Sequence, residues 1–263
     1  MKRLFSIYSL WSREIKRFYR QRSRVVGALA SPLVFWIFIG CGIGSSFNAT
    51  NTGDQVGYLE YFYPGTILLI LLFTSIFSTI SLIEDRKEGF LQAVLVSPIR
   101  RFDLVMGKVL GGATLAALQG LCFLLMAPLL GFHLSFFSWL FVLFIVLLNS
   151  LAMTALGFIL AWKMNSVQGF HAIMNLVLMP MWLLSGSLFP SDNSPQWLEL
   201  AIKLNPISYG LAALRHVLYE GRNVSFNLPS MSVSLAVMFI FIAVVLWLAV
   251  VMASKRSYKD LPA

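Results

Sequence analysis

Residues 62–83 read FYPGTILLILLFTSIFSTISLI, and residues 84–92 continue directly as EDRKEGFLQ, so an apolar run passes without a break into a charged segment. A second apolar run begins only near Val109. Nine charged side chains lie between the two runs: Glu84, Asp85, Arg86, Lys87, Glu88, Arg100, Arg101, Asp103 and Lys108. The segment also keeps an apolar pattern, made by Phe90, Leu91, Val94 and Leu95. This combination predicts a surface helix that contacts another molecule.

The composition of the chain is that of a membrane protein. Of its 263 residues, 58% are hydrophobic and only 12% are charged, whereas about a quarter of the residues of a soluble domain are charged. Six apolar runs have the length of a bilayer crossing: residues 25–47, 62–83, 109–131, 136–161, 170–189 and 231–253. The sequence therefore predicts an all-α integral membrane protein with six transmembrane helices.

The distribution of basic residues predicts the topology. Seventeen of the 20 Lys and Arg residues fall in the N-terminal segment, in residues 84–108 and 162–169, and in the C-terminal tail. Only three fall in the alternate connections. Cytoplasmic loops carry the excess of basic residues, so we expect both termini in the cytoplasm. The expected organisation is an interfacial segment (1–24), a transmembrane domain (25–253) and a cytoplasmic tail (254–263).

The N-terminal segment has the pattern of an amphipathic helix. Apolar residues recur at steps of three and four: Leu4, Ile7, Trp11, Ile15 and Phe18. Basic residues occupy the other faces, which predicts a helix lying on the cytoplasmic leaflet in contact with anionic lipid. Such a helix can be a lipid collar that only fixes topology, or it can also contact a cytoplasmic partner. Next to a membrane span, its basic cluster does not indicate nucleic-acid binding.

The longest external connection, residues 190–230, is predicted to contain two short helices. A break at Pro190 precedes a first segment that carries Trp197. Asn205-Pro206 ends it, and a second segment over 207–219 carries Tyr209 and Arg215. Both are too short to span and too apolar for a free loop. We expect interfacial or re-entrant helices at the outer face.

No catalytic or nucleotide-binding motif is found. A P-loop requires Gly-x-x-x-x-Gly-Lys-Ser/Thr, but Gly107-Lys108 is followed by Val109 and has Phe102 at the position of the first glycine. The sequence contains no His-Glu-x-x-His and no Gly-x-Ser-x-Gly. We therefore predict that the chain is not an enzyme and binds no cofactor or metal of its own.

Polar groups inside the apolar runs are few. The amides Gln119, Asn149 and Asn175 either form contacts between helices or line a substrate path. Gly40-x-x-x-Gly44 and Gly107-x-x-x-Gly111 permit close approach of helices. We find no carboxylate deep in an apolar run and expect almost no buried ionisable group, although ion-coupled transporters generally need them. Energy is therefore expected to enter from outside the membrane, through residues 84–108.

Three stretches of the sequence resemble the permease subunits of type 2 ATP-binding-cassette exporters. The first is Glu84–Gln92 with Leu95-Val96-Ser97-Pro98 and Gly107-Lys108, which is similar to the family's E-D-R-E-x-G-T-L-E-x-L-L-V-S-P segment. The others are Leu184-Ser185-Gly186-Ser187-Leu188-Phe189-Pro190 and Asn205-Pro206-Ile207-Ser208-Tyr209, with Arg215 following. Lys87 stands where the family often has Glu, and Phe90-Leu91-Gln92 replaces Thr-Leu-Glu.

The resemblance implies a permease that dimerises, here expected as a homodimer, in a bacterial inner membrane. It also implies two copies of a separate ATPase that binds ATP and Mg, and export of a drug, lipid or saccharide. The segment after the second span then forms a coupling helix that docks into the ATPase. The residues assigned to that interface are Glu84, Asp85, Arg86, Glu88, Gly89, Leu91 and Leu95. We expect Glu84 and Asp85 near a helix N-terminus, where the macrodipole favours anions.

Two other functions compete with this interpretation. The chain could be an ion-coupled carrier or channel, for which charge at mid-membrane would be the signature. It could also be a scaffold that uses the same ATPase contact without transport. Association with an ATPase, and uncoupling by substitutions at Glu84, Glu88, Leu91 or Leu95, would distinguish these cases.

Overall fold

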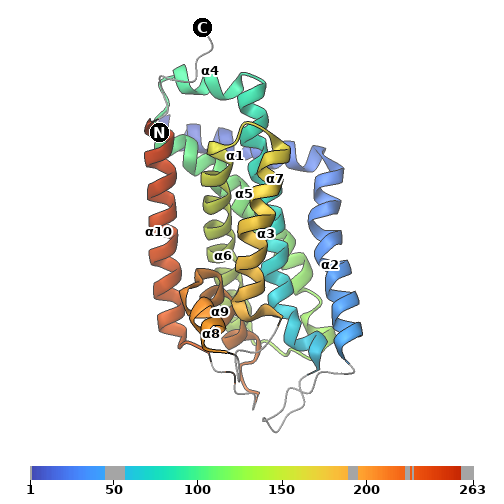
Figure 1. The fold of residues 1–263 in the computed structure, drawn as a ribbon. Coiled ribbons are helices and arrows are strands. Elements are labelled where there is room, and N and C mark those ends of the chain that lie inside the picture. Colours follow the sequence, from blue (N-terminus) through green and yellow to red (C-terminus); the bar gives the residue numbers. More distant parts are fainter. Residues whose placement is uncertain (1, 45–56, 189–194, 223–225, 227, 256–263) are drawn as a thin grey trace.

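The computed structural model describes residues 2–44, 57–188, 195–222, 226 and 228–255, and these residues form helices, turns and loops only (Figure 1). In chain order the helices are α1 (Lys2–Arg20), α2 (Arg22–Gly44), α3 (Tyr58–Lys87), α4 (Phe90–Val96), α5 (Arg101–Leu124), η1 (Ala127–Leu130), α6 (Phe136–Lys163), α7 (Val167–Trp182), η2 (Leu183–Ser187), α8 (Gln196–Leu204), α9 (Pro206–Leu218) and α10 (Met231–Lys255). Six are long and apolar enough to cross a membrane: α2, α3, α5, α6, α7 with η2, and α10. The all-α membrane fold is confirmed.

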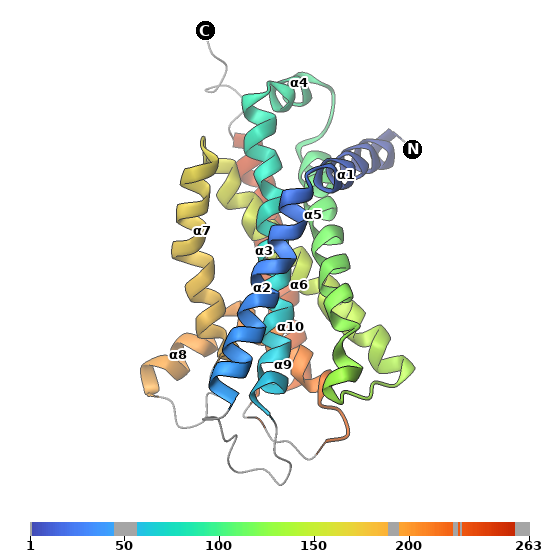
Figure 2. The same ribbon diagram turned by 90° about the vertical axis from the view of Figure 1, so that its right-hand side faces the viewer.

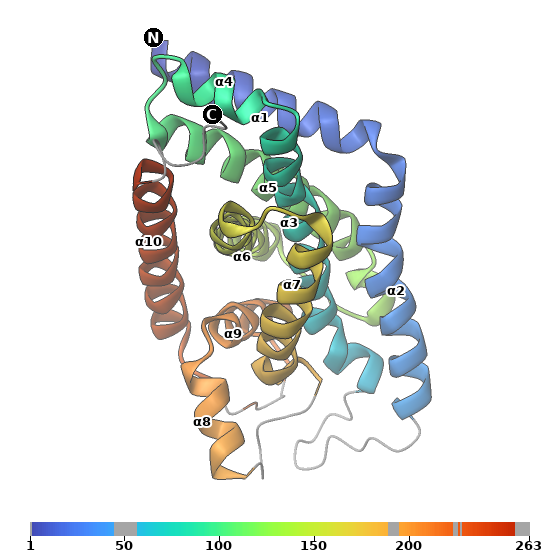
Figure 3. The same cartoon turned by 45° about the horizontal axis from the view of Figure 1, so that its top comes forward.

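Helix α3 is the centre of the bundle. Of its most apolar 18-residue window, 89% is buried inside the chain, against 22% for α2, for α7 with η2, and for α10. In Figure 3, α2 and α10 stand at opposite sides, with α3 and α6 between them. The spans α2, α7 and α10 therefore present most of their apolar surface outward, toward lipid or another protein.

The two ends of the bundle differ, and we name them by their contents. The charged end carries α1, lying across the long helices, and α4 at its tip (Figures 1 and 2). The far end carries α8 and α9. The six-span expectation places these ends on opposite sides of a membrane.

One predicted boundary is wrong. The third span was expected to begin at Val109, but α5 begins at Arg101, and α3 continues to Lys87. Most of residues 84–108 are therefore helical. Pairing of Glu84, Asp85 and Lys108 with α1 lets the ends of α3 and α5 continue as helices without water around these charges.

The N-terminal amphipathic helix is confirmed as α1, but the chain itself covers part of it. Leu10 and Phe18 are buried, whereas Leu4 and Phe5 are 76% and 73% exposed. The indole Nε1 of Trp11 donates a hydrogen bond to Thr114 of α5 over 3.1 Å. One stripe of α1 thus packs on α5. The apolar residues in the first turns of α1 are not covered by the described part of this chain.

Two glycines of α5 let α1 approach closely. A β-carbon at Gly107 would lie 2.6 Å from Cβ of Leu10, and one at Gly111 would lie 2.7 Å from Cβ of Glu14. Real β-carbons do not come so close, so only glycine fits at either position. Gly107 and Gly111 therefore form the surface of α5 on which α1 packs, and we call this surface the α1 seat.

The two short helices predicted at the far end are present as α8 and α9. The Asn205 side chain accepts a hydrogen bond from the backbone N–H of Ile207 at 3.1 Å, and Pro206 occupies the first turn, which fixes the break between them. Helix α8 has no buried residue, and its Trp197 is 67% exposed. Helix α9 packs against α6 and α10. Pro190 lies outside the described residues.

The three amides have different environments. Gln119 accepts a hydrogen bond from Thr74 of α3 at 2.5 Å, and Asn149 lies against Gly210 of α9. These two are therefore contacts between helices. Asn175 is exposed on α7, so it does not take part in the packing of this chain.

Substitution of the α1 seat provides a test of this packing. Gly107→Ala and Gly111→Ala are expected to lower the free energy of unfolding by about 1–3 kcal/mol, because the added methyl group overpacks the contact. Gly42→Ala is the matched control, since open space surrounds that position of α2. The measurement is denaturant-induced unfolding in detergent. Equal effects at all three positions would show that α1 is not seated on these glycines.

Candidate functional site at the charged end

The turn between α3 and α4 depends on Gly89. Helix α3 ends at Lys87, Gly89 has φ 77°, and α4 follows from Phe90. This left-handed conformation costs about 1–2 kcal/mol for residues with a β-carbon. Glycine is therefore the residue that lets α4 turn away from α3 within two residues, as expected of a hinge.

Helix α4 presents a different face from the one predicted. The stripe of Phe90, Leu91, Val94 and Leu95 was assigned to a partner contact, but Leu91 and Val94 are buried in the core of this chain. The guanidinium of Arg13 covers the Phe90 ring at 3.6 Å from its centroid. The stripe thus anchors α4 to the bundle, because a seven-residue helix needs tertiary packing to be stable.

The exposed residues at this end include Glu88, which was assigned to the interface, and others that were not. Val96 at the end of α4 is 79% exposed, and Phe102 at the start of α5 is 52% exposed. Lys87 and Glu88, in the turn before α4, are also exposed. Val96 and Phe102 were not predicted as contact residues. Their signal was that they are apolar residues outside the helical spacing of the buried stripe.

Asp85 is not a surface residue. Its side chain is completely buried, and two hydrogen bonds of 2.9 and 2.7 Å join it to Arg13 of α1. Arg17 of α1 and Lys108 of α5 also bind it. The pKa of the Arg13 guanidinium is raised above its ordinary value, chiefly by its hydrogen bonding to Asp85. The expectation that Asp85 contacts an ATPase directly is therefore wrong.

The electrostatic argument for Glu84 and Asp85 is also corrected. They lie in the last turn of α3, where the macrodipole disfavours anions, and not at a helix N-terminus. Cations from α1, α2 and α5 compensate for this. Glu84 and Asp85 therefore bind cations of neighbouring helices and do not stabilise the start of α4.

A second buried carboxylate completes the centre of the cluster. Glu14 of α1 is 4% exposed and accepts hydrogen bonds from Lys108 Nζ and from Ser81 Oγ, each at 2.5 Å. The expectation of almost no buried ionisable group is therefore wrong at this end. It failed because α1 covers the ends of α3 and α5. Glu14, the sole carboxylate among the basic residues of 1–24, was the available signal.

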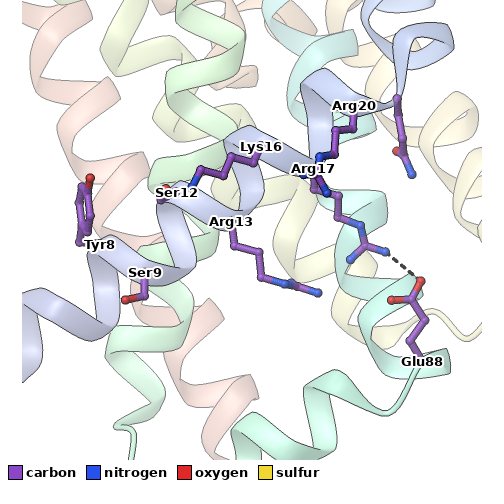
Figure 4. Close-up of a pocket in the computed structure, with 9 residues that line it drawn as sticks. Tyr8, Ser9, Ser12, Arg13, Lys16, Arg17, Arg20 and Glu88 are labelled. Carbon is purple, nitrogen blue, oxygen red and sulfur yellow. Dashed lines mark hydrogen bonds and ion pairs between the residues drawn. The ribbon is translucent and has the colours of Figure 1, made fainter.

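The periphery of the cluster is partly exposed. Arg17 binds Glu84 at 2.9 Å and Glu88 at 3.1 Å, and Arg24 of α2 also pairs with Glu84. Figure 4 shows Arg17 extending from α1 to Glu88. The whole ion-pair cluster consists of Arg13, Arg17, Arg24 and Lys108 with Glu14, Glu84, Asp85 and Glu88. Its formal charges balance, so it can fasten helices together without a counter-ion.

Arg86 fastens another pair of helices. Its guanidinium donates to the backbone carbonyls of Trp162 and Met164, each over 2.6 Å. These carbonyls lie at the end of α6, where unpaired acceptors and the macrodipole favour a cation. Arg86 therefore ties α3 to α6 rather than facing a partner.

A basic cleft of about 700 Å³ lies on the outer side of α1 (Figure 4). Its walls include Arg13 and Arg17, which are committed to the ion-pair cluster. Lys16 and Arg20 also line it, and neither has an ion-pair partner in the part of the chain that the structure describes. This side of α1 therefore presents uncompensated positive charge.

Comparisons with known proteins show which proteins this chain is similar to. The sequence profile of the ABC-2 type transporter family matches residues 6–219. The putative transport permease ycf38 of Cyanophora paradoxa is 28% identical over 208 residues, which cover 76% of this chain and 71% of that protein. Nodulation protein J of Rhizobium leguminosarum bv. trifolii is 29% identical over 196 residues, 74% of this chain and 73% of that protein. The inner membrane transport permease YhhJ of Escherichia coli is 27% identical over 174 residues, 65% of this chain and 45% of that protein.

The cluster can be tested by comparing a buried with an exposed carboxylate. Asp85→Asn is expected to lower the free energy of unfolding by about 3–5 kcal/mol, because it removes the buried anion shared by three cations and leaves the cluster with an excess positive charge. Glu88→Gln is the control, since Glu88 is 59% exposed, and a change of about 0–1 kcal/mol is expected. Denaturant titration in detergent measures both. Similar losses for the two variants would contradict the assigned roles.

Proposed function

Because the chain belongs to the ABC-2 type transporter family, we propose that it is the membrane permease of an ATP-driven exporter. The family and the curated relatives make it a multi-pass transport permease. The proposal adds that ATP and Mg bind to a separate ATPase and that transport is directed outward. The charged end then faces the cytoplasm, as the distribution of basic residues predicts.

The observation that carries the proposal is the exposed tip of the charged end. Val96, at the end of α4, and Phe102, at the start of α5, are apolar and exposed there, and Lys87 and Glu88 are exposed in the turn before α4. A surface that combines exposed apolar residues with charged ones is typical of a protein-contact site. We therefore assign this tip, defined by Lys87, Glu88, Val96 and Phe102, to the ATPase contact.

The ion-pair cluster supports a mechanism for transmitting force. A partner that pushes on α4 acts on α3 and α5, to which α1 is bound through Asp85 and Lys108. Arg86 extends the same unit to α6. Because packed interfaces switch between discrete arrangements instead of deforming continuously, this unit would move as a rigid body and carry the central helix α3 with it.

The outward faces of α2, α7 and α10 support assembly of two copies, each with its own ATPase. Most of these three spans is left uncovered by the chain, and Asn175 is exposed on α7. An amide exposed to lipid is unfavourable, so a second copy is a better environment for it. Cargo would be an amphiphilic drug, a lipid or a lipid-linked saccharide.

Substitutions at the tip should weaken binding of the ATPase without unfolding the chain. Val96→Asp and Phe102→Asp are expected to weaken binding of the ATPase about tenfold or more, since an apolar contact residue becomes a desolvated charge. Leu129→Asp is the matched control, because Leu129 is 82% exposed on η1 at the far end. The measurements are co-purification, and substrate-stimulated ATP hydrolysis in proteoliposomes.

The same experiment separates the competing functions. Transport in proteoliposomes that hold this chain alone, driven by an ion gradient, would identify a carrier or channel. ATPase association without transport would identify a scaffold. Undiminished association and coupling in both tip variants would show that the contact lies elsewhere.

A further inference from the structure

A cavity of about 380 Å³ at the far end has the features of a ligand site. It lies where η2, α8, α9 and the start of α10 meet, and its volume is in the range of small-molecule pockets. Its apolar wall is formed by Ile202, Leu211, Leu228 and Val233. The polar side chains lining it include Arg215 and Ser208 of α9.

Arg215 is a buried cation without a carboxylate. It is 3% exposed, and one terminal nitrogen donates to the carbonyl of Gly186 at 2.9 Å. Its Nε has no hydrogen-bond partner, and no carboxylate among the described residues lies within ion-pair distance. Glu199 also lines the cavity, but it pairs at 2.6 Å with Lys203 in an exposed position on α8. The buried positive charge of Arg215 therefore has no anionic partner among the described residues.

Arg222, which also lies at the far end, provides a comparison because its charge is neutralised by a carboxylate. Both arginines lie over aromatic rings, Arg215 at 4.3 Å from the Tyr61 centroid and Arg222 at 4.9 Å from the Phe132 centroid. Arg222 additionally forms an ion pair with Glu60. Ring faces stabilise a cation only in part, and burial of an unpaired charge is expensive. The missing anion is therefore specific to Arg215.

Ser208 supplies a second unused donor in the same cavity. Its side chain is 7% exposed and its Oγ has no partner. A guanidinium and a hydroxyl that line one cavity match the oxygens of a carboxylate or a phosphate, since arginine presents a rigid fork of N–H donors to such groups. The apolar wall then suits an alkyl or isoprenoid chain.

We propose that this cavity binds an amphiphile through its acidic group, with Arg215 and Ser208 contacting the carboxylate or phosphate oxygens. Such an amphiphile can come from two sources, the membrane lipid around the protein or a transported compound. Binding at this site requires no ATPase. Its failure in an experiment is therefore distinguishable from failure of the proposed function.

The test is binding of dodecyl phosphate to the purified full chain in dodecyl maltoside, followed by native mass spectrometry. Arg215→Gln is expected to weaken binding about tenfold or more, because a charge-assisted pair is lost. Arg215→Lys should lose less, since it keeps the charge but not the fork. Ser208→Ala should weaken binding a few-fold, about the worth of one hydrogen bond. Lys203→Gln, 66% exposed, is the matched control and should change affinity by less than about twofold.

A second arm with dipalmitoyl phosphatidic acid identifies the source. Comparable binding assigns the site to membrane lipid, and binding of the single-chain probe alone assigns it to a transported compound. An unchanged affinity in Arg215→Gln overturns the proposal. A wild-type chain that binds no dodecyl phosphate overturns it as well.

Thermal unfolding of every variant controls for loss of fold. Ser208→Ala carries the test if Arg215→Gln does not fold, since it removes one oxygen and leaves the guanidinium in place. A folded Ser208→Ala with unchanged affinity would then overturn the proposal.

Discussion

One buried carboxylate sets the arrangement of the charged end. Asp85 has no exposed surface and lies in the last turn of α3, where the helix dipole adds to the cost of its charge. It is tolerable there only with cations around it. Arg13 and Arg17 come from α1, and Lys108 comes from α5. Because these cations must reach Asp85, α1 lies across the ends of α3 and α5, and it approaches α5 closely at Gly107.

The same helix connects this cluster to the far end. At its other terminus, α3 carries Tyr61, whose hydroxyl donates to the carbonyl of Gly186 at 2.9 Å. Arg215 donates to that same carbonyl. Trp182 of α7 donates to the backbone carbonyl of Gly65 on α3 at 2.8 Å. A movement of α3 that begins at the charged end would therefore alter the wall of the far-end cavity, which physically links the proposed energy input to the proposed ligand site.

The predictions from the sequence that the structure corrects have a common cause. In residues 84–108, both the charged side chains and the apolar stripe of α4 were expected to face a partner protein. In the structure, Asp85 and Arg86 are used inside the chain, and Leu91 anchors α4. Val96 and Phe102 are exposed instead, and we propose that they form the contact surface. A linear pattern shows which side chains share a helix face, but it does not show that a remote segment such as α1 covers that face.

The sequence alone determined the fold class, the number of spans, the amphipathic α1, the break at Asn205-Pro206 and the resemblance to a transporter family. These depend on local properties: apolar length, helical spacing, proline and capping chemistry, and motif order. Only the tertiary structure decided that Asp85 is a buried fastener, that Gly107 and Gly111 seat α1, and that Arg215 lacks an anion. Each of those depends on which residues, distant in the chain, meet in a low-dielectric interior, where an unpaired charge is costly and every polar group needs a partner.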